Sequence, residues 1–190
     1  MPSKDTADAI FEKINYTQAA LPPGEYEHCQ FIHCDFSETN LSLIRFTDCV
    51  FSGSNLSLVK LGKTVLMDIF FKDCKMLGLQ FHHCSAFGLS FRFDNCLLNH
   101  SSFYGVKAKE TVFTNCALKE VDFTEADMSR AVFENCDLEN AHFENTVLEQ
   151  ADFRTARHFI IDPDNNRVKK AKFSPAGLPG LLYKYDIDIS

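Results

Sequence analysis

The chain has 190 residues, of which 45% are hydrophobic and 24% charged, and its formal net charge is −7. This length predicts a single domain spanning residues 1–190, and no apolar run approaches the ~20 residues of a membrane span. The first eight residues lack the apolar stretch of a secretory signal peptide, so we predict a cytoplasmic protein without membrane contacts.

Residues 1–25 are predicted to form an N-terminal cap. Within them, Leu21-Pro22-Pro23-Gly24 should interrupt strand pairing, because proline has no amide hydrogen to donate. An irregular first turn would also keep the end of a repetitive structure from pairing with another copy.

From residue 26 to residue 157 the dominant pattern has a period of five. A large apolar residue occupies every fifth position, and a small or β-branched residue lies two positions before it. This period fits neither the 3.6 of a helix nor the 2.0 of a strand. It predicts a square coil in which each five-residue unit forms one side and directs these two residues inward. The large series is Tyr26, Phe31, Phe36, Leu41, Phe46, Phe51, Leu56, Leu61, Leu66, Phe71, Met76 and Phe81, and later Phe113, Leu118, Phe123, Met128, Phe133, Leu138, Phe143, Leu148 and Phe153.

Phenylalanine also recurs at the coil length of 20 residues, and an internal period of this kind is typical of a solenoid. The column is Phe11, Phe31, Phe51, Phe71, Phe91, Phe113, Phe133, Phe153 and Phe173. Its one interval of 22, from Phe91 to Phe113, predicts a two-residue insertion within residues 92–95.

All eight cysteines lie in the small inward position, and the 22-residue step from Cys74 to Cys96 supports the same insertion. Inward thiols pack as small apolar groups, and parallel Cβ directions on neighbouring coils suit disulfides poorly. The step from Cys29 to Cys34 is the repeat period rather than a zinc-ligand spacing. We therefore predict neither a metal nor a cofactor.

With this pattern the chain resembles the pentapeptide repeat family. Ala126-Asp127-Met128-Ser129-Arg130 and Ala151-Asp152-Phe153-Arg154-Thr155 are near-consensus units of that family. The resemblance implies an all-β fold, a right-handed quadrilateral β-helix whose repeat coils span residues 26–157, with a short C-terminal capping helix or strand.

Residues 158–190 are predicted to form a C-terminal cap and dimerisation tail. Residues 171–174 should add a last strand with Phe173 on the phenylalanine column, and residues 175–182 should form a short helix or turn. Residues 183–190 alternate apolar and polar side chains, which predicts a strand.

That terminal strand has two alternative partners, its own last coil or a second copy across a two-fold axis. The resemblance to the quinolone-resistance type, together with the frequency of two-fold dimers, favours a C-terminal homodimer. The residues expected to carry it are Leu178, Leu181, Leu182, Tyr183, Tyr185, Ile187 and Ile189.

Catalytic motifs are absent from the sequence: it has no GXSXG, no glycine-rich phosphate loop and no HEXXH. A core filled with phenylalanine and leucine should also leave no cleft for a substrate. We therefore predict that the chain is not an enzyme.

The negative charge is concentrated in residues 109–155, which carry four Lys/Arg and eleven Asp/Glu. Residues 54–108 are mildly basic and place Leu58, Met67, Phe70, Leu77, Phe87 and Tyr104 in outward positions. The acidic residues predicted to bind a partner are Glu120, Asp122, Glu125, Asp127, Glu134, Asp137, Glu139, Glu144, Glu149 and Asp152.

Two functions fit these features. The resemblance implies a DNA mimic that binds a type II topoisomerase, DNA gyrase or topoisomerase IV, and modulates quinolone sensitivity. An acidic rod would approach a basic DNA groove by electrostatic steering. The alternative is a general interaction scaffold with an unknown partner, because a fold alone does not determine function. Direct nucleic-acid binding is disfavoured by a pI of about 5.4.

Overall fold

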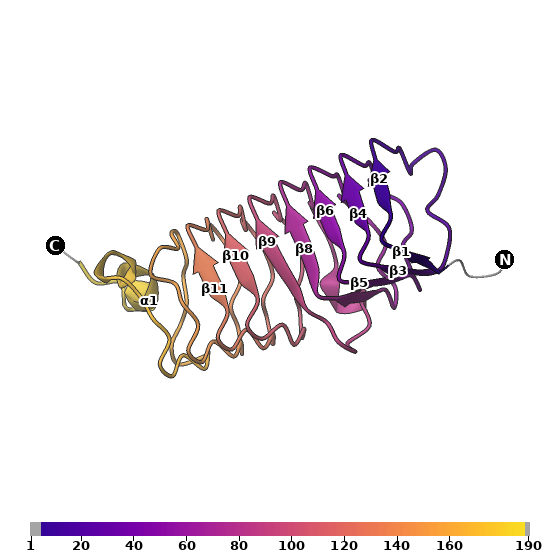
Figure 1. The fold of residues 1–190 in the computed structure, drawn as a ribbon. Helices are drawn as coiled ribbons and strands as arrows, with labels where there is room; N and C mark the ends of the chain where they lie inside the picture. The colour runs from indigo at the N-terminus through magenta and orange to yellow at the C-terminus, as the bar shows by residue number, and fades with distance from the viewer. Residues whose placement is uncertain (1–4, 189–190) are drawn as a thin grey trace.

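The computed structural model describes residues 5–188, which wind into a rod with the two termini at opposite ends (Figure 1). A four-stranded parallel sheet contains β1 (Thr6–Ala7), β3 (Glu25–Glu27), β5 (Arg45–Thr47) and β7 (Val65–Met67). A seven-stranded parallel sheet contains β2 (Ile10–Glu12), β4 (Gln30–Ile32), β6 (Val50–Ser52), β8 (Ile69–Lys72), β9 (Phe91–Asp94), β10 (Val112–Thr114) and β11 (Val132–Glu134).

Each coil has four sides, which confirms the predicted quadrilateral β-helix. The first side carries the four-stranded sheet and later the bridges Lys107 to Asp127 to Val147 to Arg167. The second side carries the seven-stranded sheet. The third side runs from Asn15 through Asp137 to Arg157, and the fourth carries the bridges Asn40 to Lys60 and Gln80 to Ser102 to Asp122 to His142.

Corners between the sides lie two residues after the large inward residues, and at most of them the backbone adopts positive φ. Asn115, Asn135 and Asn145 have φ of 54°, 53° and 52°. Asparagine enters this left-handed region more readily than most side chains. The chain therefore turns by one corner every five residues, which produces the period seen in the sequence.

Stacked aromatic rings fill the core. Phe113 lies 5.0 Å from Phe93 and 5.1 Å from Phe133, measured between ring centroids, and both pairs are nearly parallel. Rings on the neighbouring side, such as Phe103, meet this stack edge-on at 5.9 Å. Both arrangements are favoured by the charge distribution of aromatic rings.

Many of the cysteine, serine and threonine side chains in the small inward position hydrogen-bond to the preceding coil. The Cys136 thiol donates to the carbonyl oxygen of Phe113 at 3.4 Å, and the Thr146 hydroxyl donates to that of Phe123 at 2.9 Å. The Cys49 thiol donates to the carbonyl oxygen of Tyr26 at 3.3 Å in the same way. Burial raises the pKa of this thiol to about 12, so it stays protonated and able to donate. Seven cysteines are buried and free, as the packing prediction requires, whereas Cys84 is only partly buried.

The predicted position of the insertion is wrong. Phe71 aligns with Phe93 rather than with Phe91, and Phe93 aligns with Phe113 at the regular interval of 20. The two extra residues therefore precede β9 and lie in the segment 84–90, which follows the 3-10 turn η1 (Phe81–His83). Phe91 and Phe93 both point inward, because alternate strand residues share a face, so the sequence count could not distinguish them.

Both predicted boundaries of the coils are also wrong. β1 and β2 already pair with β3 and β4, so the coils begin at Thr6 and not at residue 26. Pro22 and Pro23 lie at a corner directly after the buried Leu21, and they do not end the coils as predicted. At the other end, the bridge from Asp152 to Lys172 extends the coils beyond residue 157. Phe173 stacks on Phe153 at 5.3 Å, which confirms its predicted place on the phenylalanine column, although residues 171–174 form a single bridge at Lys172 rather than a strand.

The rod ends in a short cap made of η2 (Pro175–Gly177), α1 (Pro179–Leu182) and η3 (Tyr183–Tyr185). The predicted short helix is confirmed, but the predicted strand is wrong for residues 183–188. Tyr183–Tyr185 form a 3-10 turn, and Asp186 has a left-handed φ of 49°, which is incompatible with an extended strand. Ile189 and Ser190 lie outside the described residues. Within residues 5–188, no helix has the length and apolar character needed to cross a bilayer.

Candidate partner-binding surface

The ten acidic residues do not form one patch, because consecutive units of the chain face different directions. Asp127 and Glu149 lie on the first side, Glu134 and Asp152 on the second, and Asp137 and Glu139 on the third. The remaining four surround the fourth side; they are Glu120, Asp122, Glu125 and Glu144.

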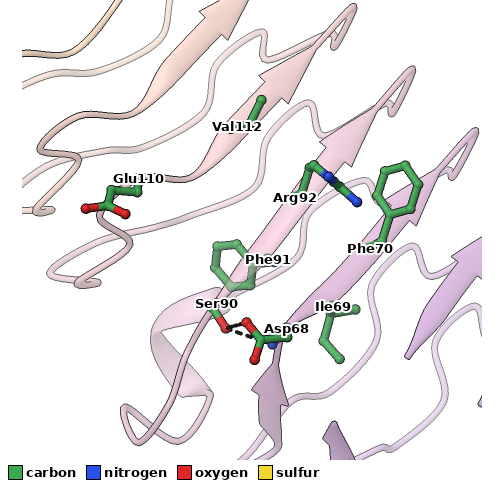
Figure 2. A pocket seen from close by; sticks show the side chains of 8 residues that line it. All are labelled: Asp68, Ile69, Phe70, Ser90, Phe91, Arg92, Glu110 and Val112. Atoms are coloured by element: carbon green, nitrogen blue, oxygen red, sulfur yellow. Dashed lines mark hydrogen bonds between the residues drawn. The ribbon is translucent and has the colours of Figure 1, made fainter. Parts of the chain in front are cut away.

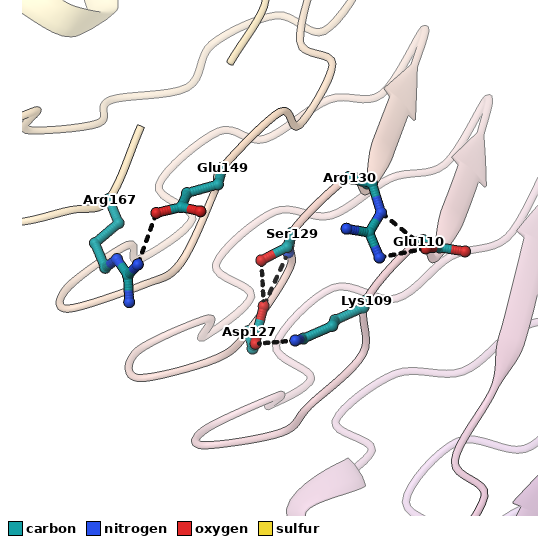
Figure 3. A network of polar contacts seen from close by, with 7 residues as sticks. All are labelled: Lys109, Glu110, Asp127, Ser129, Arg130, Glu149 and Arg167. Atoms are coloured by element: carbon teal, nitrogen blue, oxygen red, sulfur yellow. Dashed lines mark hydrogen bonds and ion pairs between the residues drawn. The ribbon is translucent and has the colours of Figure 1, made fainter. Parts of the chain in front are cut away.

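Cations neutralise most acids of the first and second sides (Figure 3); Glu134 on the second side is the exception, without an ion pair in the described residues. Lys109 lies 3.2 Å from Asp127, and Arg167 lies 2.7 Å from Glu149. Arg130 pairs with Glu110 on the neighbouring coil. On the second side, Asp152 contacts Arg154 at 2.7 Å and Lys172 at 3.9 Å. These carboxylates contribute little net negative charge to their surroundings.

Asp137, on the third side, is the most enclosed of the acids, with 12% of its side chain exposed. It contacts His158 at 2.8 Å, Lys119 at 3.5 Å and Arg157 at 3.7 Å. Burial opposes its ionisation, but the hydrogen bond from His158 and the charge of Lys119 outweigh burial, and the pKa of Asp137 is lowered below its ordinary 3.8.

We expect Asp137→Asn to lower the free energy of unfolding by about 1 kcal/mol at pH 7, because charge-assisted hydrogen bonds are lost. The folded pKa of Asp137 lies below the unfolded one, so its contribution is present above about pH 4 and is lost as the pH falls through the folded pKa. Urea unfolding at pH 7 and at pH 3 measures both values. A difference between variant and wild type that is as large at pH 3 as at pH 7 contradicts this assignment.

The fourth side keeps its negative charge. In the part of the chain that the structure describes, none of its four acids forms an ion pair with lysine or arginine; Glu120 contacts only His100, at 3.2 Å. Glu125 and Glu144 lie on adjacent coils, where the Glu125 amide donates to the Glu144 carbonyl at 2.8 Å. The charge of Glu125 raises the pKa of the nearby Tyr104 hydroxyl. We call Glu120, Asp122, Glu125 and Glu144 the acidic side.

The outward apolar residues of the middle coils differ in exposure: Leu58, Phe87 and Tyr104 are exposed, and Met67, Phe70 and Leu77 are half-buried. Phe87 is 69% exposed in the segment that holds the insertion, whereas Phe70 is half-covered by Arg92, whose guanidinium lies 4.4 Å from its ring. Figure 2 shows the open hollow of about 290 Å³ beside this pair. Its Asp68 carboxylate accepts a hydrogen bond from Ser90 at 2.9 Å, and its Glu110 carboxylate pairs with Arg130.

The predicted dimerisation residues lie together at the C-terminal end. Tyr183, Tyr185 and Ile187 are 70%, 56% and 55% exposed, and Leu178 is 46% exposed. Leu181 and Leu182 are half-buried, with Leu181 packed against the core, and Ile189 lies outside the described residues. Sequence reasoning missed Ile160, which is 46% exposed near the same end. An exposed apolar group of this kind is typical of a contact surface.

Metal-binding geometry is not found in the described ranges, since residues 5–188 hold no group of three or more ligand side chains. His82 and His83 lie beside each other, with 4.2 Å between ring centroids. Burial, followed by the charge of His83, lowers the pKa of His82.

Comparison with known proteins identifies the family. The model of the pentapeptide repeat region matches residues 25–92 and 89–153, which together exceed half of the chain. This protein therefore belongs to the pentapeptide repeat family. The two matches overlap at residues 89–92, at the end of the segment 84–90 where the insertion interrupts the period.

Solved structures of this family share the fold. Full-length QnrB1, a plasmid-mediated fluoroquinolone resistance protein, is similar over 97% of this chain and 100% of its own, with a TM-score of 0.57 and 15% identity. A trypsin-treated variant of QnrB1 is similar over 98% of this chain and 100% of its own, with a TM-score of 0.51 and 17% identity. No curated protein matches the sequence significantly.

Proposed function

We propose that this chain is a non-enzymatic protein-binding rod whose acidic side mimics DNA toward a type II topoisomerase, DNA gyrase or topoisomerase IV, and so modulates quinolone sensitivity. The observation that carries the proposal is the set of four carboxylates on one side of the rod, without lysine or arginine partners among residues 5–188. The fold shared with QnrB1, a fluoroquinolone resistance protein, supports the choice of partner.

The physical basis is the electrostatic field of the acidic side. Surface carboxylates without cationic partners attract a basic groove over a distance of about 10 Å at moderate salt, and this attraction accelerates association. Binding should weaken as salt rises, as binding to DNA itself does. The paired acids of the other sides contribute little to this field.

Neutralising the acidic side tests the proposal. In a gyrase supercoiling assay with and without ciprofloxacin, we expect the wild type to inhibit or to protect the enzyme. Glu120→Gln, Asp122→Asn, Glu125→Gln and Glu144→Gln together should weaken that effect about tenfold or more, because the steering charge is lost. The matched control changes the same number of charges at the other end of the rod, with Glu25→Gln, Glu27→Gln, Asp35→Asn and Glu38→Gln.

Three outcomes are distinguishable. No effect of the wild type on either enzyme rejects the topoisomerase as partner. An effect that the acidic-side variant retains rejects the acidic side as the binding surface. An equal loss in the control variant shows that only total charge matters and not its position.

We also propose that two copies join at their C-terminal ends across a two-fold axis. The exposed Leu178, Tyr183, Tyr185 and Ile187 support this arrangement, because they gather at the end of the rod that carries the cap. In such a dimer both acidic sides flank the centre, where a two-fold symmetric topoisomerase would meet them. We therefore also propose a cytoplasmic location without a membrane partner, because the proposed partner acts on DNA.

The second candidate is a general interaction scaffold. The internal neutralisation of Asp127, Glu149 and Asp152 favours it, since these ion pairs stabilise neighbouring coils against each other and leave less charge for mimicry. The same assay separates the candidates, because a scaffold for another partner leaves gyrase unaffected.

A further inference from the structure

A hollow of about 300 Å³ lies between the last coil and the C-terminal cap. Its floor is apolar: Ala176 and Pro179 line it, and Gly177 and Gly180 pack directly over the buried Phe159. A Cβ at Gly180 would lie 2.1 Å from the carbonyl oxygen of Phe159, and one at Gly177 would lie 2.7 Å from its ring. Glycine at both positions therefore allows the close approach that brings the cap onto the coil.

Two basic side chains form the rim of this hollow. Arg157 and His158 both line it, and their side chains are 63% and 59% exposed. On their inner side they share one carboxylate, that of Asp137, with Lys119. The exposed parts of Arg157 and His158 can therefore still pair with an anionic group that approaches from solvent.

The end of the chain has complementary chemistry. Residues 186–189 read Asp-Ile-Asp-Ile, so carboxylates alternate with large apolar side chains. Asp186, Ile187 and Asp188 are exposed and follow η3 at the far end of the rod (Figure 1). Such an alternating segment fits a hollow with an apolar floor and a basic rim. Its apolar side chains can pack on the floor while its carboxylates pair with the rim.

The start of the tail is held away from the hollow of its own chain. Lys184 contacts Asp162 at 2.6 Å and also Asp164, two residues that continue the fourth side, whereas Arg157 belongs to the third side. The left-handed turn at Asp186 follows directly after this anchor. A second copy is therefore the better source of the segment.

We propose that the hollow between the last coil and the cap receives residues 186–189 of a second copy. Asp186 and Asp188 of the incoming tail pair with Arg157 and His158, and Ile187 packs against Ala176 and Pro179, the exposed apolar residues of the lining. The exchange is reciprocal, so one dimer contains two such contacts related by the two-fold axis, as an isologous interface requires. This inference rests on the proposed C-terminal dimer.

Charge reversal on either partner of the contact tests the inference. The first variant carries Arg157→Glu, and the second carries Asp186→Lys and Asp188→Lys. Each should dissociate about tenfold more readily than the wild-type dimer, since both of its contacts place like charges together. Arg154→Glu is the matched control, because Arg154 is equally exposed and ion-paired but does not line the hollow. Light scattering and native mass spectrometry measure the dimer, and circular dichroism verifies that each variant folds.

Mixing the two variants distinguishes exchange between chains from contact within one chain. In a mixed dimer the glutamate rim of the first variant meets the lysine tail of the second, and the unchanged Arg157 of the second meets the aspartate tail of the first. We therefore expect equimolar mixing to restore wild-type affinity within about twofold.

A mixture that stays dissociated, while a single chain with all three substitutions dimerises normally, shows that the tail binds its own hollow and overturns the inference. Variants that dimerise like the wild type also overturn it. A monomeric wild type rejects the proposed dimer itself.

Discussion

Replacing Phe113 by alanine is expected to lower the free energy of unfolding by about 3–5 kcal/mol, the range for removal of a buried phenylalanine. Phe113 is fully buried and stacks on Phe93 and Phe133, while Phe103 and Phe123 meet it edge-on. The backbone around it is fixed by parallel pairing with coils on both sides, so the cavity cannot collapse without breaking strand register.

Urea unfolding followed by circular dichroism measures this loss. Phe87→Ala is the control, since Phe87 is 69% exposed and its truncation should change stability by less than about 0.5 kcal/mol. A loss below about 1 kcal/mol at Phe113 would show that neighbouring rings move into the space, and that the aromatic stack is less rigid than its geometry indicates.

The second large effect is expected from Asn166→Leu, which should cost about 2–4 kcal/mol. The Asn166 amide accepts from the Thr146 backbone at 2.9 Å and donates to the carbonyls of Phe143 at 3.0 Å and Asp162 at 2.9 Å. Leucine of similar size would leave the Thr146 amide and the Phe143 carbonyl buried and unpaired, which costs about 1–3 kcal/mol for each group, whereas the Asp162 carbonyl still accepts from the Asn165 amide at 3.3 Å.

Thermal and urea unfolding of the variant test this expectation, with Asn165→Leu as control. Asn165 is the exposed neighbour, and its backbone carbonyl keeps its bond from Asn145 whatever the side chain. Equal stability of the two variants would mean that water replaces the Asn166 amide in the last coil.

The period of five was sufficient to predict the core, because each inward residue is specified by its position alone. It failed where two inward positions hold the same residue: Phe91 and Phe93 fit the column equally well by counting, and only strand pairing separates them. The tail failed for a different reason. Residues 183–190 alternate apolar and polar side chains, which is typical of a strand, but a strand also needs a neighbouring strand to pair with. Residues 183–185 form the 3-10 turn η3 instead.

The acidic surface was predicted as a stretch of sequence, but a step of five residues moves to the next side of the coil. Acids close in the chain therefore face different directions. The interval that brings side chains together is 20, and at this interval Glu110 meets Arg130 and Lys119 meets Glu139. Comparison of charges at that spacing would have found these ion pairs from sequence, and would have left the acidic side as the set without cationic partners.

The interruption of the first side at residues 84–90 has a consequence for cooperativity. The four-stranded sheet ends at β7, and the ladder of the first side resumes only at Lys107, whereas the second side continues without a break. In a solenoid, stability is transmitted from one coil to the next through their shared interface. At this point the interface lacks the ladder of one of its four sides, so we expect unfolding under denaturant or mechanical load to pause here and divide the rod into two foldons, with the acidic side and the cap remaining in one of them.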